Sequence, residues 1–410
     1  MSNRSNALPA FHRVVKTLFL GILLTLTWAN VDANVKANET PPAKSKIVTS
    51  SLLLDVTRAG DRLVAVGERG HILYSDDNGE SWAQTIKSPV SVTLTAVTFP
   101  TPKMGWAVGH EGVILHSADG GETWVKQFDG AELLKSNLKL LKERYAQKQA
   151  AFAAYEEAYN ELSEEEQQAK EIEYEDRNNE VIDAEFLVDD AQEYLKNGVT
   201  FPFLNVWFRT RFEGFAMGAY GQIVRTTNGG QSWDNYFQKV PNVRQFHYNA
   251  MIDHNRLLFM AGERGTIFRS ANGGLAWEKL ESPYIGSFFD ILSVPNSDEL
   301  IVFGLLGNAF RSTDNGQTWQ RVNTTTDSGL AGGALKKNGE LIFVGNDGAM
   351  VESSGNRQNF TVKFRQDRLN MSAVVEAENG NIVIAGQNGI RVMRADNGED
   401  IALRQINPDS

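Results

Sequence analysis

A glycine-containing pattern repeats seven times along the chain, and it constrains the fold more than any other feature. Each copy reads small or apolar residue, Gly, two variable residues, Gly, and then a short strand-forming run. The first glycines of the copies are Gly67, Gly109, Gly218, Gly262, Gly304, Gly345 and Gly386. A repeated unit of about 42 residues is typical of a β-propeller, in which each copy builds one blade. The sequence therefore predicts an all-β fold, a seven-bladed β-propeller.

One step between copies is much longer than the others. The spacings are 42, 109, 44, 42, 41 and 41 residues, so the second exceeds the first by 67. An insertion at residues 131–198 accounts for this difference and separates the second blade from the third. The extra length interrupts the repeat without altering its pattern on either side.

The insertion has a helical period where the blades have a period of two. From Leu134 to Leu162 and again from Tyr174 to Leu195, most seam positions are apolar or aromatic and follow one another at spacings of three and four. Ser163 and Glu166 match a capping box that starts the second helix, and Gly198 suits a helix C-cap. We expect an antiparallel α-helical hairpin inserted in the propeller.

The aromatic members of the first seam have two interpretations. Tyr145, Phe152 and Tyr159 could hold the two helices together, or they could contact a partner. A long protrusion adds little to the stability of a ring, so we expect the hairpin as a whole to bind another protein. The run Phe201–Leu204 at its base is suited to dock it on the ring.

Five copies of the repeat continue into an Asp-box, a turn that ends in Trp. Its Asp or Asn accepts backbone N–H groups, and its Trp is expected to pack between blades. The defining residues are Asp77, Trp82, Asp119, Trp124, Asn228, Trp233, Asn272, Trp277, Asp314 and Trp319. Carboxylates at a fixed spacing could indicate metal or acid–base chemistry. Because Asn replaces Asp in two copies, we assign these residues a structural role.

Three arginines recur just before the Ser or Thr that opens a box. They are Arg225, Arg269 and Arg311. One interpretation is an arginine-lined patch for an acidic partner, and the other is a set of ordinary strand residues on the blade surface. Their repetition at one blade position argues against convergence on a central active site.

The first residues have the pattern of a secretory signal peptide. Basic residues precede an apolar run at Leu18–Ala29, and Val31-Asp32-Ala33 offers a small-x-small cleavage site. About 12 apolar residues are too few to span a bilayer. We therefore divide the chain into a signal peptide at 1–33, blades at 34–130, the hairpin at 131–198 and blades at 199–410, and we expect a periplasmic protein.

Charge and composition exclude several function classes. The net charge is −11, and residues 131–198 alone hold 18 acidic against 8 basic residues. A chain without a basic stripe is a poor nucleic-acid binder. With no Cys there is no thiol catalysis and no disulfide-linked partner. The six His show no paired ligand spacing, so we predict no metal, no cofactor and no catalytic residue.

The repeat resembles a known family. The phrase from Val206 to Gly221 and the box from Thr226 to Trp233 are similar to those of the photosystem II stability/assembly factor-like propellers. That family is exported and has photosynthetic and non-photosynthetic members. The resemblance covers about residues 47–130 and 199–406. It implies a seven-bladed scaffold that helps a membrane-protein complex to assemble, while the hairpin departs from the photosynthetic pattern.

Two functions follow from these observations. The first is a non-catalytic assembly factor or accessory subunit of an inner-membrane complex, peripheral to the membrane through its partner. An RND-type exporter is a candidate client, suggested by the bacterial relatives. The alternative is a sialidase-like glycoside hydrolase or glycan-binding propeller, because sialidases share the Asp-box. The chain has no Arg-Ile-Pro-type motif near the first blade, which disfavours the alternative.

The ring also has to close between its two ends. We expect Lys46–Ser51 to form an extra strand on the last blade, beside Ile401–Ile406, so that the two ends of the ring join and an edge is hidden.

Overall fold

The computed structural model of the chain describes residues 39–45 and 47–406. The chain divides into two units, Met1–Lys36 and Ala37–Ser410, and only the second contains described residues. The signal peptide predicted at 1–33 lies outside the described residues. Among the helices in the described ranges, none has the length and apolar character needed to cross a membrane.

The strands form seven sheets that follow the repeat, and all their pairs are antiparallel except one at the edge of blade 1. Blade 1 holds β1 (Leu53–Ala59), β2 (Arg62–Gly67), β3 (Ile72–Ser75) and β4 (Ser81–Gln84). Blade 2 holds β5 (Leu94–Thr98), β6 (Gly105–Gly109), β7 (Ile114–Ser117) and β8 (Val125–Phe128). Blade 3 holds β9 (Phe203–Phe208), β10 (Gly214–Gly218), β11 (Ile223–Thr226) and β12 (Asp234–Asn235).

The remaining four sheets have the same order. Blade 4 holds β13 (Tyr248–His254), β14 (Leu257–Gly262), β15 (Ile267–Ser270) and β16 (Glu278–Lys279). Blade 5 holds β17 (Phe288–Ser293), β18 (Leu300–Gly304), β19 (Ala309–Ser312) and β20 (Gln320–Val322). Blade 6 holds β21 (Leu330–Leu335), β22 (Leu341–Gly345), β23 (Ala349–Ser353) and β24 (Phe360–Phe364). Blade 7 holds β25 (Met371–Glu376), β26 (Ile382–Gly386) and β27 (Gly389–Met393).

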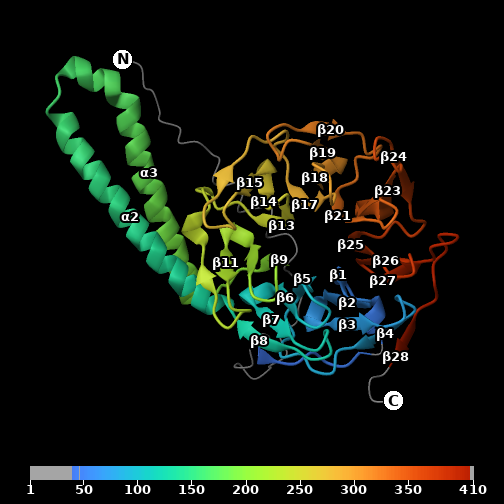
Figure 1. The fold of residues 1–410 in the computed structure, drawn as a ribbon. Coiled ribbons are helices and arrows are strands. Elements are labelled where there is room, and N and C mark those ends of the chain that lie inside the picture. Colours follow the sequence, from blue (N-terminus) through green and yellow to red (C-terminus); the bar gives the residue numbers. More distant parts are fainter. Residues whose placement is uncertain (1–38, 46, 407–410) are drawn as a thin grey trace, which may run out of the picture. The chain divides into compact units, whose positions relative to one another are not determined.

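The first strands of the blades join the sheets into a closed ring. Each contacts the first strand of the next blade, and β25 contacts β1. Figure 1 shows these strands nearest the centre of the ring formed by the seven sheets. The seven-bladed propeller predicted from the repeat is therefore confirmed.

The two glycines of each repeat have different roles in this architecture. In the second copy, Gly109 lies so close to β5 that a Cβ there would come within 2.2 Å of the carbonyl oxygen of Thr93. The turn that follows has positive φ at two successive residues, Glu111 (58°) and Gly112 (63°). Tight hairpin turns that match the twist of the strands require this pair of conformations. In six of the seven copies a short 3-10 turn occupies these positions.

The hydrophobic core lies between neighbouring blades. Trp82, for example, is fully buried against Val383 and Val392 of blade 7, and Trp124 is buried against Val64 of blade 1. Because each box tryptophan covers the preceding sheet, sequential blades share their apolar faces. A large closed ring of this kind can bury a core without disulfides.

The closure of the ring differs from the prediction. The last strand, β28 (Arg404–Ile406), pairs in parallel with β4 of blade 1, and it does not join blade 7. Val48–Ser50 is a 3-10 turn (η2), not a strand, and Lys46 lies outside the described residues. The buried Val48 packs with Ile390 of blade 7, so the N-terminal segment fills a gap in the core and provides no sheet edge.

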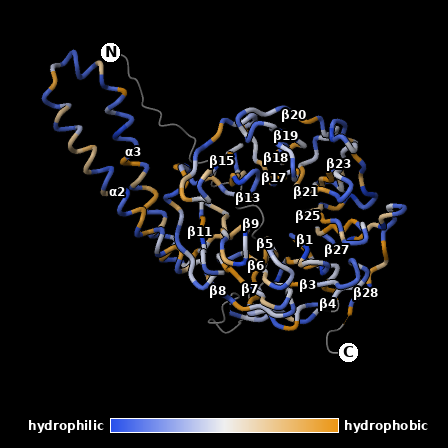
Figure 2. Tube along the Cα trace, viewed as in Figure 1, coloured by the Kyte–Doolittle hydropathy of each residue, from blue (hydrophilic) through white to orange (hydrophobic). Residues whose placement is uncertain are grey.

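Residues of the insertion form the two helices that the sequence predicts. They are α2 (Gly130–Asn160) and α3 (Glu164–Asn197). Asp129 caps α2 by accepting the N–H of Ala131, and Ser163 with Glu166 forms the capping box of α3. Gly198 ends α3 in the left-handed conformation, with φ 64°. Figure 1 shows the paired helices leaving the ring, and Figure 2 shows that hydrophilic residues dominate much of their length.

Candidate functional site

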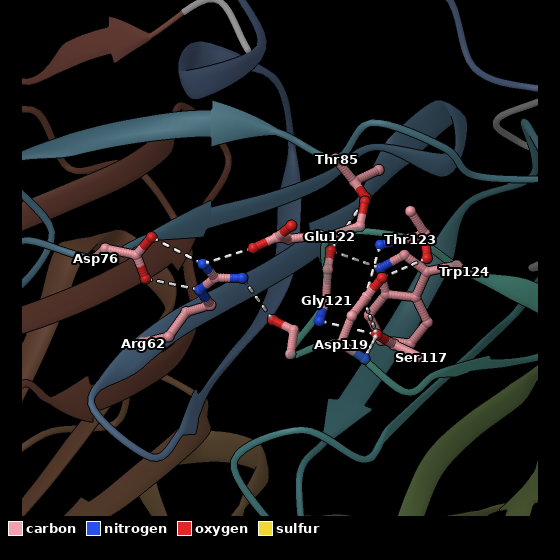
Figure 3. A network of polar contacts seen from close by, with 10 residues as sticks. Arg62, Asp76, Thr85, Ser117, Asp119, Gly121, Glu122, Thr123 and Trp124 are labelled. Atoms are coloured by element: carbon pink, nitrogen blue, oxygen red, sulfur yellow. Dashed lines mark hydrogen bonds and ion pairs between the residues drawn. The ribbon is translucent and has the colours of Figure 1, made fainter.

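The Asp-boxes are hydrogen-bonded turns. In the second box, the Asp119 carboxylate accepts the Ser117 hydroxyl at 2.8 Å and the backbone N–H of Thr123 at 3.0 Å. The indole N–H of Trp124 donates to the carbonyl of Gly121 at 3.0 Å. Figure 3 shows this network with its carboxylate turned into the loop. The Asp119 carboxylate is therefore engaged in hydrogen bonds within its own turn.

The other four boxes repeat the contacts of the Asp119 side chain. Asp77, Asn228, Asn272 and Asp314 each accept the Ser or Thr hydroxyl two residues earlier and the N–H four residues later. Hydrogen bonds from the Thr318 hydroxyl and N–H lower the pKa of Asp314 to about 2. Among the residues that the structure describes, no group of His, Asp and Glu could hold a metal ion.

The recurring arginines are held by partners within the chain. Arg225 donates to Glu213 at 2.9 Å and to the Tyr236 hydroxyl at 3.0 Å. Arg269 pairs with Glu278 at 2.8 Å and also donates to the carbonyl of Asn315, in the box of the next blade. These guanidinium groups therefore have roles within the chain.

Arg311 has the same arrangement one blade further on. It pairs with Glu299 at 2.7 Å and donates to the carbonyl of Arg357 in blade 6. Figure 3 shows a related case that the sequence did not suggest, because Arg62 binds Asp76 and Glu122 and donates to Gly120 of the second box. Arg62, Arg269 and Arg311 thus each link one blade to the next, whereas both partners of Arg225 lie in its own blade.

Two carboxylates on innermost strands were not predicted from the sequence. Asp55 accepts the N–H of Val97 at 2.8 Å, and Asp290 accepts the N–H of Gly333 at 3.1 Å, each across a blade boundary. Burial raises the pKa of Asp55 to about 6 and that of Asp290 to about 7, although these N–H groups lower it. Both residues follow a bulge in their strand, which the repeat pattern does not reveal.

The aromatic residues of the hairpin seam lie between its helices. Phe152 and Tyr159 contact Tyr174 of α3, with ring centroids 5.2 and 4.7 Å apart. Tyr145 packs against the buried cluster that contains Leu141 and Val188, nearer the ring. The structure thus gives these three residues contacts that join the helices, the first of the two interpretations offered by the sequence.

The opposite face of α3 exposes apolar side chains that the sequence analysis did not single out. Ile172 is 76% exposed, Ile182 39% and Phe186 64%. At about 100° per residue they lie within about 80° of one another, away from the seam with α2, along about 21 Å of helix. We call these three residues the apolar stripe.

The charge of the hairpin is concentrated on the same helix. Helix α3 carries thirteen acidic and three basic residues, whereas α2 carries four acidic and five basic residues. The apolar stripe therefore runs through the most acidic element of the protein. Apolar residues at spacings of three and four mark the face that joins the two helices. This pattern therefore did not predict the apolar stripe on the outer face of α3.

The base of the hairpin is fixed to blades 2 and 3. Asn235 donates to Ser136 at 3.0 Å and to Asn137 at 2.7 Å, and Gln238 donates to the carbonyl of Leu140 at 3.0 Å. The buried Leu133 and Phe203 share one core cluster, so the run that follows the hairpin does help to dock it. These contacts hold the base of the hairpin in a defined position on the ring.

Comparisons with known proteins agree with this architecture. A family model described as Photosynthesis system II assembly factor YCF48 matches residues 188–349. A solved structure described as YCF48 bound to D1 peptide has a TM-score of 0.56 and 15% identity, and covers 86% of this chain and 98% of that one. The chain is thus similar to YCF48 over residues 188–349 in sequence pattern, and in the propeller fold.

Other solved propellers are similar at lower identity. YCF48 from Cyanidioschyzon merolae has a TM-score of 0.54 and 14% identity, covering 84% of this chain and 95% of its own. The WD40 propeller domain of Doa1 has a TM-score of 0.54 and 11% identity, covering 86% and 95%. At these identities the likeness of this chain to each solved structure concerns the fold. No curated protein matches the chain.

Proposed function

We propose that this YCF48-like propeller is a non-catalytic assembly factor or accessory subunit that binds a membrane-protein complex through its hairpin. The apolar stripe on α3 is the observation that carries the proposal. Ile182 and Phe186 lie one helical turn apart, and neighbouring apolar side chains left in water with charged groups around them are characteristic of protein interaction sites.

The chemistry of the stripe defines the partner surface that fits it. Acidic residues lie on both sides of the stripe, among them Asp183 and Asp189. A complementary surface would present apolar side chains flanked by Lys or Arg. Opposite charges speed association and exclude wrong partners, while the buried apolar area supplies most of the affinity.

The comparisons support a binding role in general terms. The family model is described as an assembly factor, and one solved YCF48 is described as bound to a peptide. By analogy, the ring would serve as a rigid platform and the hairpin as the added contact element. The carboxylates of the Asp-boxes are occupied in turns, so we assign them no catalytic task.

The location and the client are parts of the same proposal. We infer a periplasmic location from the basic and apolar segment before residue 33, which has the pattern of a secretory signal peptide. The client would be an inner-membrane complex, with an RND-type exporter as the first candidate to examine, and the protein would be peripheral to the membrane through that client.

Affinity purification from detergent-solubilised envelope tests the proposal. The full chain is compared with a variant in which Ala131–Gly198 is replaced by a short Gly-Ser linker. We expect the full chain to enrich an inner-membrane complex and the deletion variant to lose it.

The deletion also needs a check of folding, since it uncovers Phe203 and Phe237. A cooperative thermal transition of the deletion variant would establish that the ring is intact. Equal recovery of the same complex with both proteins would refute the role of the hairpin.

A further inference from the structure

A cleft of about 180 Å³ lies between the base of the hairpin and blade 3. Helices α2 and α3 form one wall. The other wall comes from the two 3-10 turns of blade 3, η5 (Ala219–Gly221) and η6 (Phe237–Lys239), and from the loop after η6. No sequence pattern identified this cleft, because its walls come from three separate segments.

The floor of the cleft is apolar. Leu134, Leu141 and Phe237 line it and are almost fully buried, and Leu187 of α3 completes this part. An apolar cavity of about 150 Å³ can hold a benzene molecule. The cleft therefore has room for one side chain of the size of leucine or phenylalanine, and it is too small for a whole cofactor.

Two buried amides line the same space. Gln222 is only 4% exposed, and within the described part of the chain its side-chain amide has no hydrogen-bond partner. Asn137 is 8% exposed, and its carbonyl accepts Asn235 while its N–H₂ group has no partner among the described residues. Neither amide is among the fully enclosed side-chain atoms of the described residues that lack a partner, so solvent reaches both amides through the cleft. These amides are thus available to a ligand that offers both N–H and C=O groups, as a peptide backbone does.

The rim of the cleft carries an aromatic side chain, a positive charge and a negative charge. Tyr220 is 44% exposed and contacts Phe201, with ring centroids 4.3 Å apart. Its φ of 55° belongs to the tight turn, so the backbone fixes the ring at the rim. Arg244 on the blade and Asp190 on α3 line opposite walls, and neither forms an ion pair with a described residue.

The cleft continues the track of the apolar stripe. Ile182, Phe186 and Asp190 follow one another at intervals of four residues on α3, so the last turn before the cleft carries exposed apolar groups. A partner segment bound along the stripe would therefore reach the cleft while it remains in contact with α3.

We propose that this cleft binds an extended peptide segment of the partner, with one leucine- or phenylalanine-sized side chain on the apolar floor and the backbone hydrogen-bonded to Gln222 and Asn137. This inference rests on the proposed function, because it names the ligand class of the same hairpin region. It assigns the cleft to a peptide, since a purely apolar ligand would leave both amides unpaired.

The test uses small-molecule probes, each a single amino acid with capped ends. N-acetyl-phenylalanine amide and N-acetyl-leucine amide are titrated into the purified protein, with N-acetylglycine amide as the negative probe, and binding is followed by ligand-observed NMR. We expect millimolar binding of the two apolar probes and at least tenfold weaker binding of the glycine probe.

Two variants locate the binding. Leu187→Trp should fill the floor and abolish binding, and Gln222→Leu should weaken it about tenfold while keeping the shape. Leu275→Trp, at an exposed position on the ring, is the matched control and should bind as the parent does. If Leu187→Trp loses its thermal transition, Gln222→Leu still decides the question.

Two results would overturn the inference. One is the absence of probe binding to the parent protein at millimolar concentration, and the other is binding that neither cleft variant changes. Either result leaves the affinity purification of the full chain unaffected, so failure of the cleft and failure of the hairpin as a docking element are distinguishable.

Discussion

Carboxylates in this protein fall into two electrostatic classes. Those of the Asp-boxes accept several hydrogen bonds in small turns, and the pKa of Asp314 falls to about 2 as a result. Those of the innermost strands are buried, and the pKa of Asp290 rises to about 7. The first class stabilises the fold when ionised, whereas ionisation of the second class opposes folding.

The first residue-scale prediction concerns the box of blade 5. Asp314→Ala removes the acceptor for the Ser312 hydroxyl and the Thr318 N–H, so it should lower the free energy of unfolding by about 1–2 kcal/mol. Asp314→Asn should cost less, because Asn228 makes the same contacts in blade 3. Urea denaturation at pH 7 measures the free energy of unfolding of both variants. An alanine variant as stable as the parent would remove the structural role assigned to the boxes.

The second residue-scale prediction concerns pH. An unfolded Asp titrates near 3.9, whereas in the folded protein the pKa is about 6 for Asp55 and about 7 for Asp290. Between about pH 4 and pH 7 the folded state therefore binds more protons than the unfolded state. The contribution of these groups to the free energy of unfolding should accordingly fall as pH rises through this window.

Substitution of one carboxylate isolates this effect. Asp290→Asn should reduce the loss of stability between pH 5 and pH 7.5 by about 1 kcal/mol or more, as measured by urea denaturation. Asp61→Asn is the control, since its side chain is 91% exposed. A pH dependence that Asp290→Asn leaves unchanged would contradict the raised pKa.

At the scale of elements, the hairpin separates into a docked base and a tip held by aromatic contacts. The sequence predicted the seam, because apolar spacing in a helix directly reports the buried face. In α3 the same spacing of three and four residues includes one charged residue, Arg177. Arg177 is exposed, pairs with Glu173 and stacks its guanidinium over Tyr155 at 4.4 Å. A long cationic side chain can cover an aromatic ring from outside, which spacing alone does not distinguish from burial.

The element-scale prediction concerns the tip. Tyr174 contacts Phe152 and Tyr159 and donates to Glu156 at 2.7 Å. Tyr174→Ala should remove about 1 kcal/mol of aromatic contact energy and speed amide exchange about fivefold near residues 150–175. Exchange of residues 133–141 at the base should stay as in the parent. Hydrogen-exchange mass spectrometry measures both, and equal acceleration at the base would contradict the division into base and tip.

At the scale of the whole molecule, the repeat predicted the blades, which recur along the chain. It did not predict the contacts that join separate segments of the chain. Blades, boxes and the inserted hairpin follow from residues that recur at fixed spacing. The pairing of β28 with β4 does not, because any exposed edge strand offers the same backbone groups to the last strand. The cleft is also absent from the pattern, because Leu134, Leu187 and Phe237 meet only in the folded chain.

The central claim is that the outer face of α3 binds a partner surface that is apolar and basic. The most direct test is affinity purification with the double variant Ile182→Lys and Phe186→Lys. Its matched control is Leu275→Lys and Ile285→Lys, which places the same charges on exposed apolar positions of the ring. We predict that the α3 variant loses at least nine-tenths of the recovered membrane complex and that the ring variant keeps it. Full recovery with the α3 variant would contradict the account.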